Sequence, residues 1–196
     1  MMNSPHLAAL GCLLAVSASL SAAETFRLGT RSEEIPEAGA VKFTTLSAGL
    51  NEYVFLPPPG WKTEPDSKTA TVTWTSPDFR SLLRLRVPLG DSETIPKPNA
   101  DELRVLATES KAENKIVEES PCYTAGLAGL AFDIERTTDT KAAIRMRRAF
   151  VPVAGGFVEF TVSGPADEFP NRQSDLSRFL NSFRATRATP NSASSQ

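Results

Sequence analysis

The chain has 196 residues, of which 40% are hydrophobic and 22% are charged, and this composition is typical of a folded globular protein rather than a disordered one. The formal net charge at pH 7 is −2, so there is no general excess of positive charge to attract nucleic acid or an anionic membrane. We therefore expect one domain with a real core and no role in binding nucleic acid.

The first 23 residues have the features of a Sec-type signal peptide. An apolar stretch at residues 7–20 is followed by the small residues Ser21-Ala22-Ala23. At about 1.5 Å per residue, this stretch is too short to cross a hydrocarbon core of about 30 Å. We predict cleavage near Ala23 and a periplasmic or secreted protein without a membrane span. Because residues 1–6 contain no Lys or Arg, an uncleaved anchor and lipidation at Cys12 remain as alternatives.

Cleavage of the leader would also remove two residues of the types that commonly carry chemistry. The only histidine, His6, and one of the two cysteines, Cys12, would be lost, which leaves Cys122 as the single thiol. A chain of this kind builds no Ser-His-Asp or Cys-His arrangement, no His-ligated metal site and no internal disulfide. We therefore predict no catalytic residue, no metal and no cofactor, and we interpret Cys122 as a small buried side chain.

By composition, the rest of the chain divides into three parts. Residues 24–40 contain several Glu, Pro and Gly residues with little periodicity and are predicted to be an irregular lead-in segment. Residues 41–185 are predicted to form one α+β domain. Residues 186–196 are small and polar and are predicted to be a disordered tail.

Within the domain, the hydrophobic pattern predicts strands and then a helix. Short β-prone runs occupy residues 53–56, 71–75 and 81–87, and the first stops at a Pro-Pro-Pro-Gly turn. Asn99 is a predicted N-cap that precedes two acidic residues in the first helical turn. Apolar residues at helical spacing extend this helix to about Ala112.

The next two strands have complementary faces. If Ile134 pairs with Met146, the apolar residues of both strands share one face. The same register places opposite charges across from each other, in the pairs Asp133–Arg147 and Glu135–Arg145. A single register therefore satisfies the apolar and the charged pairs together.

A second hairpin is predicted at Ala154-Gly155-Gly156, as a three-residue loop in which glycine can adopt positive φ. This loop places Phe150 opposite Phe160, so we expect a three-stranded meander with one apolar face. Arg148 is the exception, because its position directs it into that face, where it either snorkels to the rim or marks a bulge.

The last predicted element is an amphipathic helix. Its apolar residues follow the i, i+3, i+4, i+7 spacing, at Leu176, Phe179, Leu180 and Phe183. We predict that this helix packs on the apolar face of the meander.

Basic side chains provide the only candidate for a ligand or partner site. The candidate patch consists of arginines from two strands together with an aromatic residue after the Pro-Gly turn, namely Arg84, Arg86, Arg145, Arg147, Arg148 and Trp61. An anionic ligand would suit such a patch. The alternative is that the arginines pair with Asp133, Glu135 and Glu159 on a solvated sheet face, and that Trp61 covers the end of the sheet.

The order of elements resembles that of the PsbP-like (Mog-type) α/β/α sandwich family. Three segments within residues 41–184 carry the resemblance, Phe55-Leu56-Pro57-Pro58-Pro59-Gly60-Trp61, Gly156-Phe157-Val158-Glu159-Phe160 and Phe179-Leu180-Asn181-Ser182-Phe183. The resemblance implies an antiparallel β-sheet flanked by helices and a non-catalytic binding or accessory role, as in most characterised members, which include a lumenal photosystem subunit. It implies no photosystem role here, because the family's metal-associated positions commonly involve histidine and the predicted mature chain contains none.

The sequence thus favours an exported, non-catalytic binding or accessory protein whose partner is an unidentified protein or small ligand of the cell envelope. One alternative is a carboxylate-dependent hydrolase of envelope polymers, which requires two acids about 5–9.5 Å apart in one cleft. A second alternative is a structural envelope protein.

Overall fold

The computed structural model describes residues 26–37, 39–109, 111–124, 126–137 and 142–187. The predicted signal peptide and the tail beyond Arg187 lie outside these ranges. The described chain is built of strands β1 Arg27–Ile35, β2 Gly39–Ala48, β3 Asn51–Phe55, β4 Lys62–Asp66, β5 Thr71–Thr75, β6 Leu82–Arg86, β7 Asn114–Thr124, β8 Leu127–Thr137, β9 Ala143–Val153, β10 Gly156–Pro165 and β11 Arg184–Arg187, and of helices α1 Ala100–Thr108 and α2 Phe169–Ser182.

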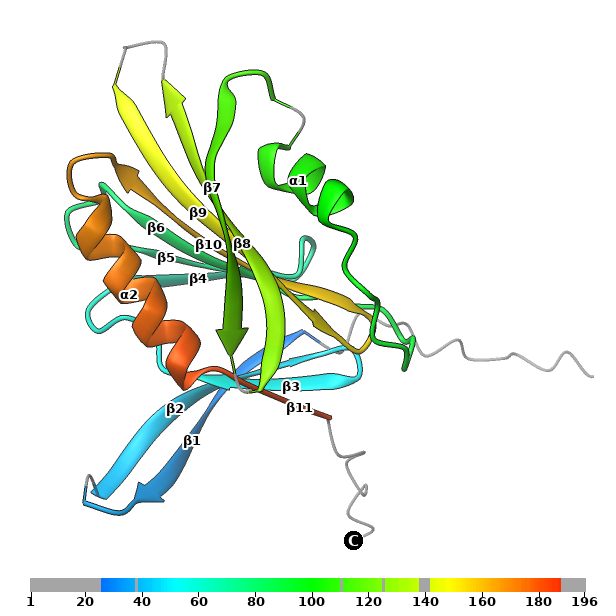
Figure 1. Ribbon diagram of the computed structural model, residues 1–196. Coiled ribbons are helices and arrows are strands. Elements are labelled where there is room, and N and C mark those ends of the chain that lie inside the picture. Colours follow the sequence, from blue (N-terminus) through cyan, green and yellow to red (C-terminus); the bar gives the residue numbers. More distant parts are fainter. Residues whose placement is uncertain (1–25, 38, 110, 125, 138–141, 188–196) are drawn as a thin grey trace, which may run out of the picture.

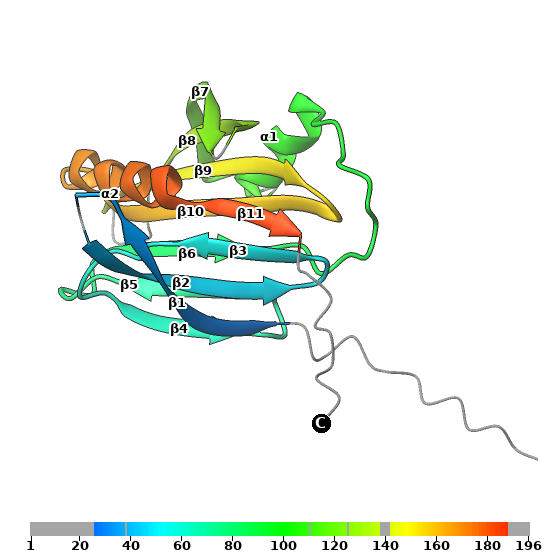
Figure 2. The same cartoon turned by 90° about the horizontal axis from the view of Figure 1, so that it is seen from below.

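These strands form two antiparallel sheets rather than the single sheet expected from the sequence (Figures 1 and 2). The larger sheet has seven strands in the order β4-β5-β6-β10-β9-β8-β7, and the smaller has four in the order β1-β2-β3-β11. The predicted combination of antiparallel strands with helices is therefore confirmed in part: the described chain is mostly strand, and it has two sheets where one was expected.

The second sheet includes much of the segment predicted to be irregular. Arg27–Ile35 forms β1 and pairs along its whole length with β2, from Arg27–Ser47 to Ile35–Gly39. At the other end, β11 pairs with β3 and extends two residues into the predicted tail. Both strands are short of buried apolar residues, which explains why their sequences show no clear period.

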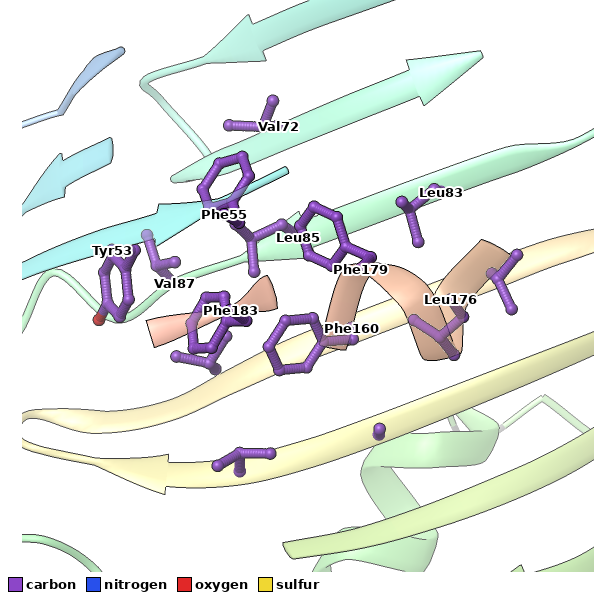
Figure 3. Close-up of a cluster of buried hydrophobic side chains, with 14 of the residues drawn as sticks. Tyr53, Phe55, Val72, Leu83, Leu85, Val87, Phe160, Leu176, Phe179 and Phe183 are labelled. Carbon is purple, nitrogen blue, oxygen red and sulfur yellow. The ribbon is translucent and has the colours of Figure 1, made fainter. Parts of the chain in front are cut away.

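The main core lies between the two sheets and α2 (Figure 3). Aromatic rings from the small sheet, the large sheet and α2 meet there. Their centroids are 5.0 Å apart for Phe55 and Phe179, 5.5 Å for Phe55 and Trp74, and 4.8 Å for Phe160 and Phe183. Leu176, Phe179 and Phe183 of the predicted amphipathic stripe are all buried in this core, and Leu180 packs at its margin.

The register predicted between the first two meander strands is confirmed. Ile134 pairs with Met146, and the two charged pairs, Asp133–Arg147 and Glu135–Arg145, lie directly opposite each other.

The register predicted for the second hairpin is wrong by one residue. Val153 pairs with Gly156, so the loop contains only Ala154 and Gly155, and Phe150 faces Glu159 rather than Phe160. Gly155 has φ +82°, a left-handed conformation that glycine adopts without steric cost. A shift of one residue moves every side chain of β10 to the other face of the sheet.

As a result, the meander has two apolar faces. On one, Phe132, Ile134 and Phe150 pack against Leu103 and Ala107 of α1. On the other, Val158, Phe160 and Val162 join the main core under α2. The prediction that α2 covers the face of Phe132 is therefore wrong, because α1 covers it, and each face of the large sheet has its own helix (Figure 1).

Helix α1 begins as predicted and ends early. The side chain of Asn99 accepts a hydrogen bond from the backbone N–H of Asp101, as an N-cap does. The helix stops at Thr108 rather than near Ala112, because Glu109 takes a left-handed conformation with φ 53°.

Both outer strands of the large sheet have irregular features. Every residue of β4 is exposed and the strand contains Pro65. On the opposite edge, β7 contains Pro121 and a bulge between Ile116 and Glu118. Neither strand was predicted, because proline and an irregular polar pattern conceal the two-residue period.

Among the residues described, neither helix has the length and apolar character that crossing a bilayer requires.

Candidate functional site

The face of the large sheet that carries α1 is only partly covered. Helix α1 lies over β7 and β8, whereas the outward face of β5 and β6 carries polar side chains without a helix above them. A groove of about 1140 Å³ lies between α1 and these strands.

Strand register places two rows of side chains on this face of the sheet, and most of them form the floor of the groove. One row runs across four strands through Thr73, Arg84, Thr161 and Arg148, and the adjacent row through Thr71, Arg86, Glu159 and Phe150. Because directly paired residues of antiparallel strands project to the same face, these hydroxyl and guanidinium groups all lie on the groove side.

One wall of the groove is apolar and exposed. Val105 and Leu106 of α1 are 58% and 51% exposed, Leu89 is 43% exposed, and Phe157 of β10 lines the same space. Leu106 follows the helical spacing of a core residue, but Leu103 and Ala107 supply the buried contacts of α1, and Leu106 instead points into the groove.

Arg148 joins α1 to the floor. Its side chain is 7% exposed, and its guanidinium donates hydrogen bonds to Oε1 of Glu159 and to the carbonyls of Leu106 and Ala107, the latter two at 2.9 and 2.8 Å. It also binds Oε1 of Glu109 at 3.1 Å. A cation at the last carbonyls of a helix is favourable both as a cap and with the helix dipole. Arg148 is therefore neither a snorkelling side chain nor a bulge, but a buried ionic contact that fixes the position of α1.

Among the described residues that line the groove, Glu109 and Glu159 form ion pairs, whereas Asp66 and two of the arginines do not. A hydrogen bond from Lys111, with the charges of Arg148 and Arg84, lowers the pKa of Glu109. A hydrogen bond from the Thr69 hydroxyl lowers the pKa of Asp66. In contrast, neither Arg84 nor Arg86 lies within ion-pair distance of any carboxylate in the described ranges.

A smaller cavity of about 220 Å³ adjoins the groove beneath the end of α1. The two spaces share Arg84, Glu109 and Arg148, and the smaller one is also lined by Lys111 and Arg136. Positive charge therefore continues from the groove into this cavity.

Three of the six predicted patch residues meet in the groove, namely Arg84, Arg86 and Arg148. The other three do not. Arg147 and Arg145 lie on the opposite face, where both approach the buried carboxylate of Asp133, at 3.0 and 3.8 Å. Trp61 lies outside the groove lining, beneath the guanidinium of Arg172 at 5.7 Å from its ring centre.

Sequence reasoning missed the apolar wall and the threonines of the floor. Thr71 and Thr73 alternate with Val72 and Trp74, so their position on one face was readable, but a threonine row alone indicates no ligand. Leu89 and Phe157 come from a loop and a hairpin end, and only the fold brings them to α1.

The groove lacks the features of a carboxylate-dependent hydrolase. A general acid needs a raised pKa, whereas the pKa values of Glu109 and Asp66 are both lowered. Glu109 and Glu159 both form ion pairs with Arg148. Within the described ranges, there is also no group of three or more His, Cys, Asp or Glu residues able to hold a metal ion.

Cys122 is buried on β7, as predicted, and burial raises the pKa of its thiol. We expect the native protein to react with a thiol reagent at pH 8 roughly tenfold or more slowly than the unfolded protein, because the reactive species is an exposed thiolate. Timed reaction with a chromogenic disulfide, with and without 6 M guanidinium chloride, measures this ratio. One thiol per unfolded exported chain is expected, whereas two would show that Cys12 is retained.

The sequence matches no protein-family model and no functionally curated protein. Among solved structures, CyanoP, the PsbP protein of Synechocystis sp. PCC 6803, aligns with 90% of this chain and 99% of its own, with a TM-score of 0.51 and 12% identity. LpqN of Mycobacterium tuberculosis, described as involved in cell envelope biogenesis, aligns with 81% of this chain and 91% of its own, with a TM-score of 0.48 and 10% identity.

A Pseudomonas aeruginosa protein of unknown function aligns with 76% of this chain and 92% of its own, with a TM-score of 0.42 and 12% identity. At these identities the similarity concerns the fold alone. The chain therefore resembles PsbP-like proteins in its fold, as the order of its elements predicted.

Proposed function

We propose that this protein is an exported, non-catalytic binding protein of the cell envelope, and that the groove beside α1 is its binding site. The observation that carries the proposal is the combination, in one groove, of two arginines without ion pairs and an exposed apolar wall. Exposed apolar side chains next to a few convergent polar groups are the usual composition of a ligand site.

Export is supported by the leader, with its apolar stretch and small-residue cleavage site. A non-catalytic role is supported by the groove chemistry, in which the acids with shifted pKa values stay ionised. The hydrogen bonds from Arg148 to the end of α1 suit binding as well, because a site whose wall is already held in place loses less conformational entropy when a ligand binds.

Filling the groove tests this proposal. Thr73→Trp places an indole on the groove floor, whereas Thr75→Trp makes the same change one row further along β5, outside the groove lining. The protein, exported with its own leader, is incubated with lipid and aqueous extracts of the host envelope and measured by native mass spectrometry. We expect a bound small molecule on the unmodified protein and on Thr75→Trp, and its loss from Thr73→Trp.

Matched unfolding temperatures of the two variants show that both are folded. The proposal is wrong if no molecule binds from either extract, or if Thr73→Trp and Thr75→Trp retain the same bound molecule.

A further inference from the structure

We propose that the groove ligand is a single-chain anionic amphiphile, whose acid group binds Arg84 and Arg86 and whose hydrocarbon chain lies along Val105, Leu106 and Leu89. This inference rests on the proposed function and adds the chemical class of the ligand. A carboxylate and a phosphate ester are two sources of the same chemistry, an oxyanion joined to an alkyl chain.

The position of the acid group follows from β6. Arg84 and Arg86 are two residues apart on one strand, so their Cα atoms are about 6.6–6.8 Å apart and both side chains project into the groove. Guanidinium groups at this spacing are able to converge on one oxyanion, which each contacts through paired N–H donors.

Two of the three acidic residues that line the groove, Glu109 and Glu159, are already paired with basic side chains. The third, Asp66, lies two strands away from Arg86 and accepts hydrogen bonds from the Thr69 hydroxyl and the backbone N–H of Lys68. Glu159, which faces Arg86 across the strand pair, is bound by Arg148, and Glu109 is bound by Lys111 and Arg148. The hydroxyl of Thr73, directly opposite Arg84, is placed to complete the contacts of an oxyanion, whereas that of Thr71 already donates to the carbonyl of Thr69. An incoming acid therefore displaces water rather than an existing ion pair.

The position of the chain follows from the apolar wall. Val105 and Leu106 are each more than half exposed on α1, although a helix of this kind normally turns such residues inward, and Leu89 and Phe157 continue the apolar surface. Each methylene buried there contributes about fourfold in affinity. Because only the wall is apolar and the floor is polar, the groove provides a surface for one chain rather than two.

An acidic peptide fits these surfaces less well. Its carboxylates would suit Arg84 and Arg86, but its backbone amides would lie against an apolar wall that offers them no hydrogen bond. A neutral lipid would suit the wall and leave the two arginines without a partner.

The test compares amphiphiles that have both an acid group and an alkyl chain with ligands that have only one of these two features. Calorimetric titrations of the full mature protein use dodecanoate and dodecyl phosphate, dodecyl maltoside as a neutral molecule with the same chain, acetate and inorganic phosphate as head groups alone, and hexaglutamate as an acidic peptide. All amphiphiles are kept below their micelle concentrations. We expect dodecanoate or dodecyl phosphate to bind one to one, about tenfold or more tightly than any of the other four probes.

Substitutions test which side chains bind the acid group and which contact the alkyl chain. Arg84→Gln and Arg86→Gln are expected to weaken binding of the anionic amphiphile about fivefold to twentyfold and to leave dodecyl maltoside unchanged. Val105→Ser and Leu106→Ser are expected to weaken both. The matched controls are Arg178→Gln on the exposed side of α2 and Val117→Ser on β7, and neither is expected to change either affinity.

The outcomes separate this inference from the proposal beneath it. If dodecyl maltoside or hexaglutamate binds as tightly as the anionic amphiphiles, the ligand class is wrong and the groove remains a binding site. The ligand class is also wrong if no probe binds while an extract molecule is lost from Thr73→Trp. If no molecule binds from the extracts, or if Thr73→Trp retains every bound molecule, both the proposed function and this inference are wrong. The ratio between dodecanoate and dodecyl phosphate identifies the preferred source of the oxyanion.

Discussion

Replacing Arg148 with methionine is expected to lower the free energy of unfolding by about 3–5 kcal/mol, because the side chain of Glu159 is only 11% exposed and would be left without its charged partner. The carbonyls of Leu106 and Ala107 would lose their donor as well. For a domain of this size, the melting temperature should fall by roughly 6–20 °C. Urea unfolding gives the free energy, and hydrogen exchange of the α1 amides should rise more than that of β5.

A double variant separates the energetic effect of the ion pair from the effect of filling the space that its side chains occupy. In Arg148→Met/Glu159→Met, neither charge remains, so the double variant is expected to be more stable than Arg148→Met by about 2 kcal/mol or more. Arg178→Met, on the exposed side of α2, should stay within about 0.5 kcal/mol of the unmodified protein. A double variant less stable than Arg148→Met would show that the pair does not act as inferred.

Gly129→Ala is the second substitution with a large expected effect. A Cβ added at Gly129 would lie 2.0 Å from the backbone oxygen of Phe150 and 3.1 Å from the Cα of Val151. Backbone atoms are unable to rotate away as a side chain does, so β8 and β9 must move apart where their pairing begins. We expect a loss of about 3 kcal/mol or more, at the upper end of the cost of overpacking.

Gly126→Ala, three residues earlier, is the control. Gly126 has φ +79° and no atom within 4 Å of an added Cβ, so this variant carries only the strain of the left-handed conformation, about 1–2 kcal/mol. Equal unfolding midpoints for the two variants in urea would show that the contact with Phe150 is relieved at little cost.

The success or failure of the sequence predictions depended on how many constraints each strand carried. The β8–β9 register was predictable because Ile134–Met146 and the flanking charges all require the same alignment. Along β9, however, Ala149, Phe150 and Val151 are all buried, one after another, because both faces of the large sheet are covered. Consecutive buried residues remove the two-residue period, so the β9–β10 register depended on a guess of loop length, and that guess was one residue too long.

The candidate site was likewise predictable only where the sequence itself constrains the position of a side chain. Adjacent residues of a strand point to opposite faces, so Arg147 and Arg148 must lie on opposite faces of the sheet. The sequence already indicated that Arg148 is the one that points to the apolar face of the meander. That Arg84 and Arg86 share a groove with Arg148 depends on β6 and β9 both pairing with β10, which the local sequence does not contain. The apolar wall depends on where α1 docks, which is likewise a property of the whole fold.

The prolines at the two borders of the large sheet have a consequence for behaviour at high concentration. An outer strand with free N–H and C=O groups is a template on which another molecule of the same protein can add a strand. Pro65 and Pro121 each remove one donor from these borders, and the bulge in β7 twists its border out of line. Addition of further strands to the large sheet is therefore disfavoured at both borders.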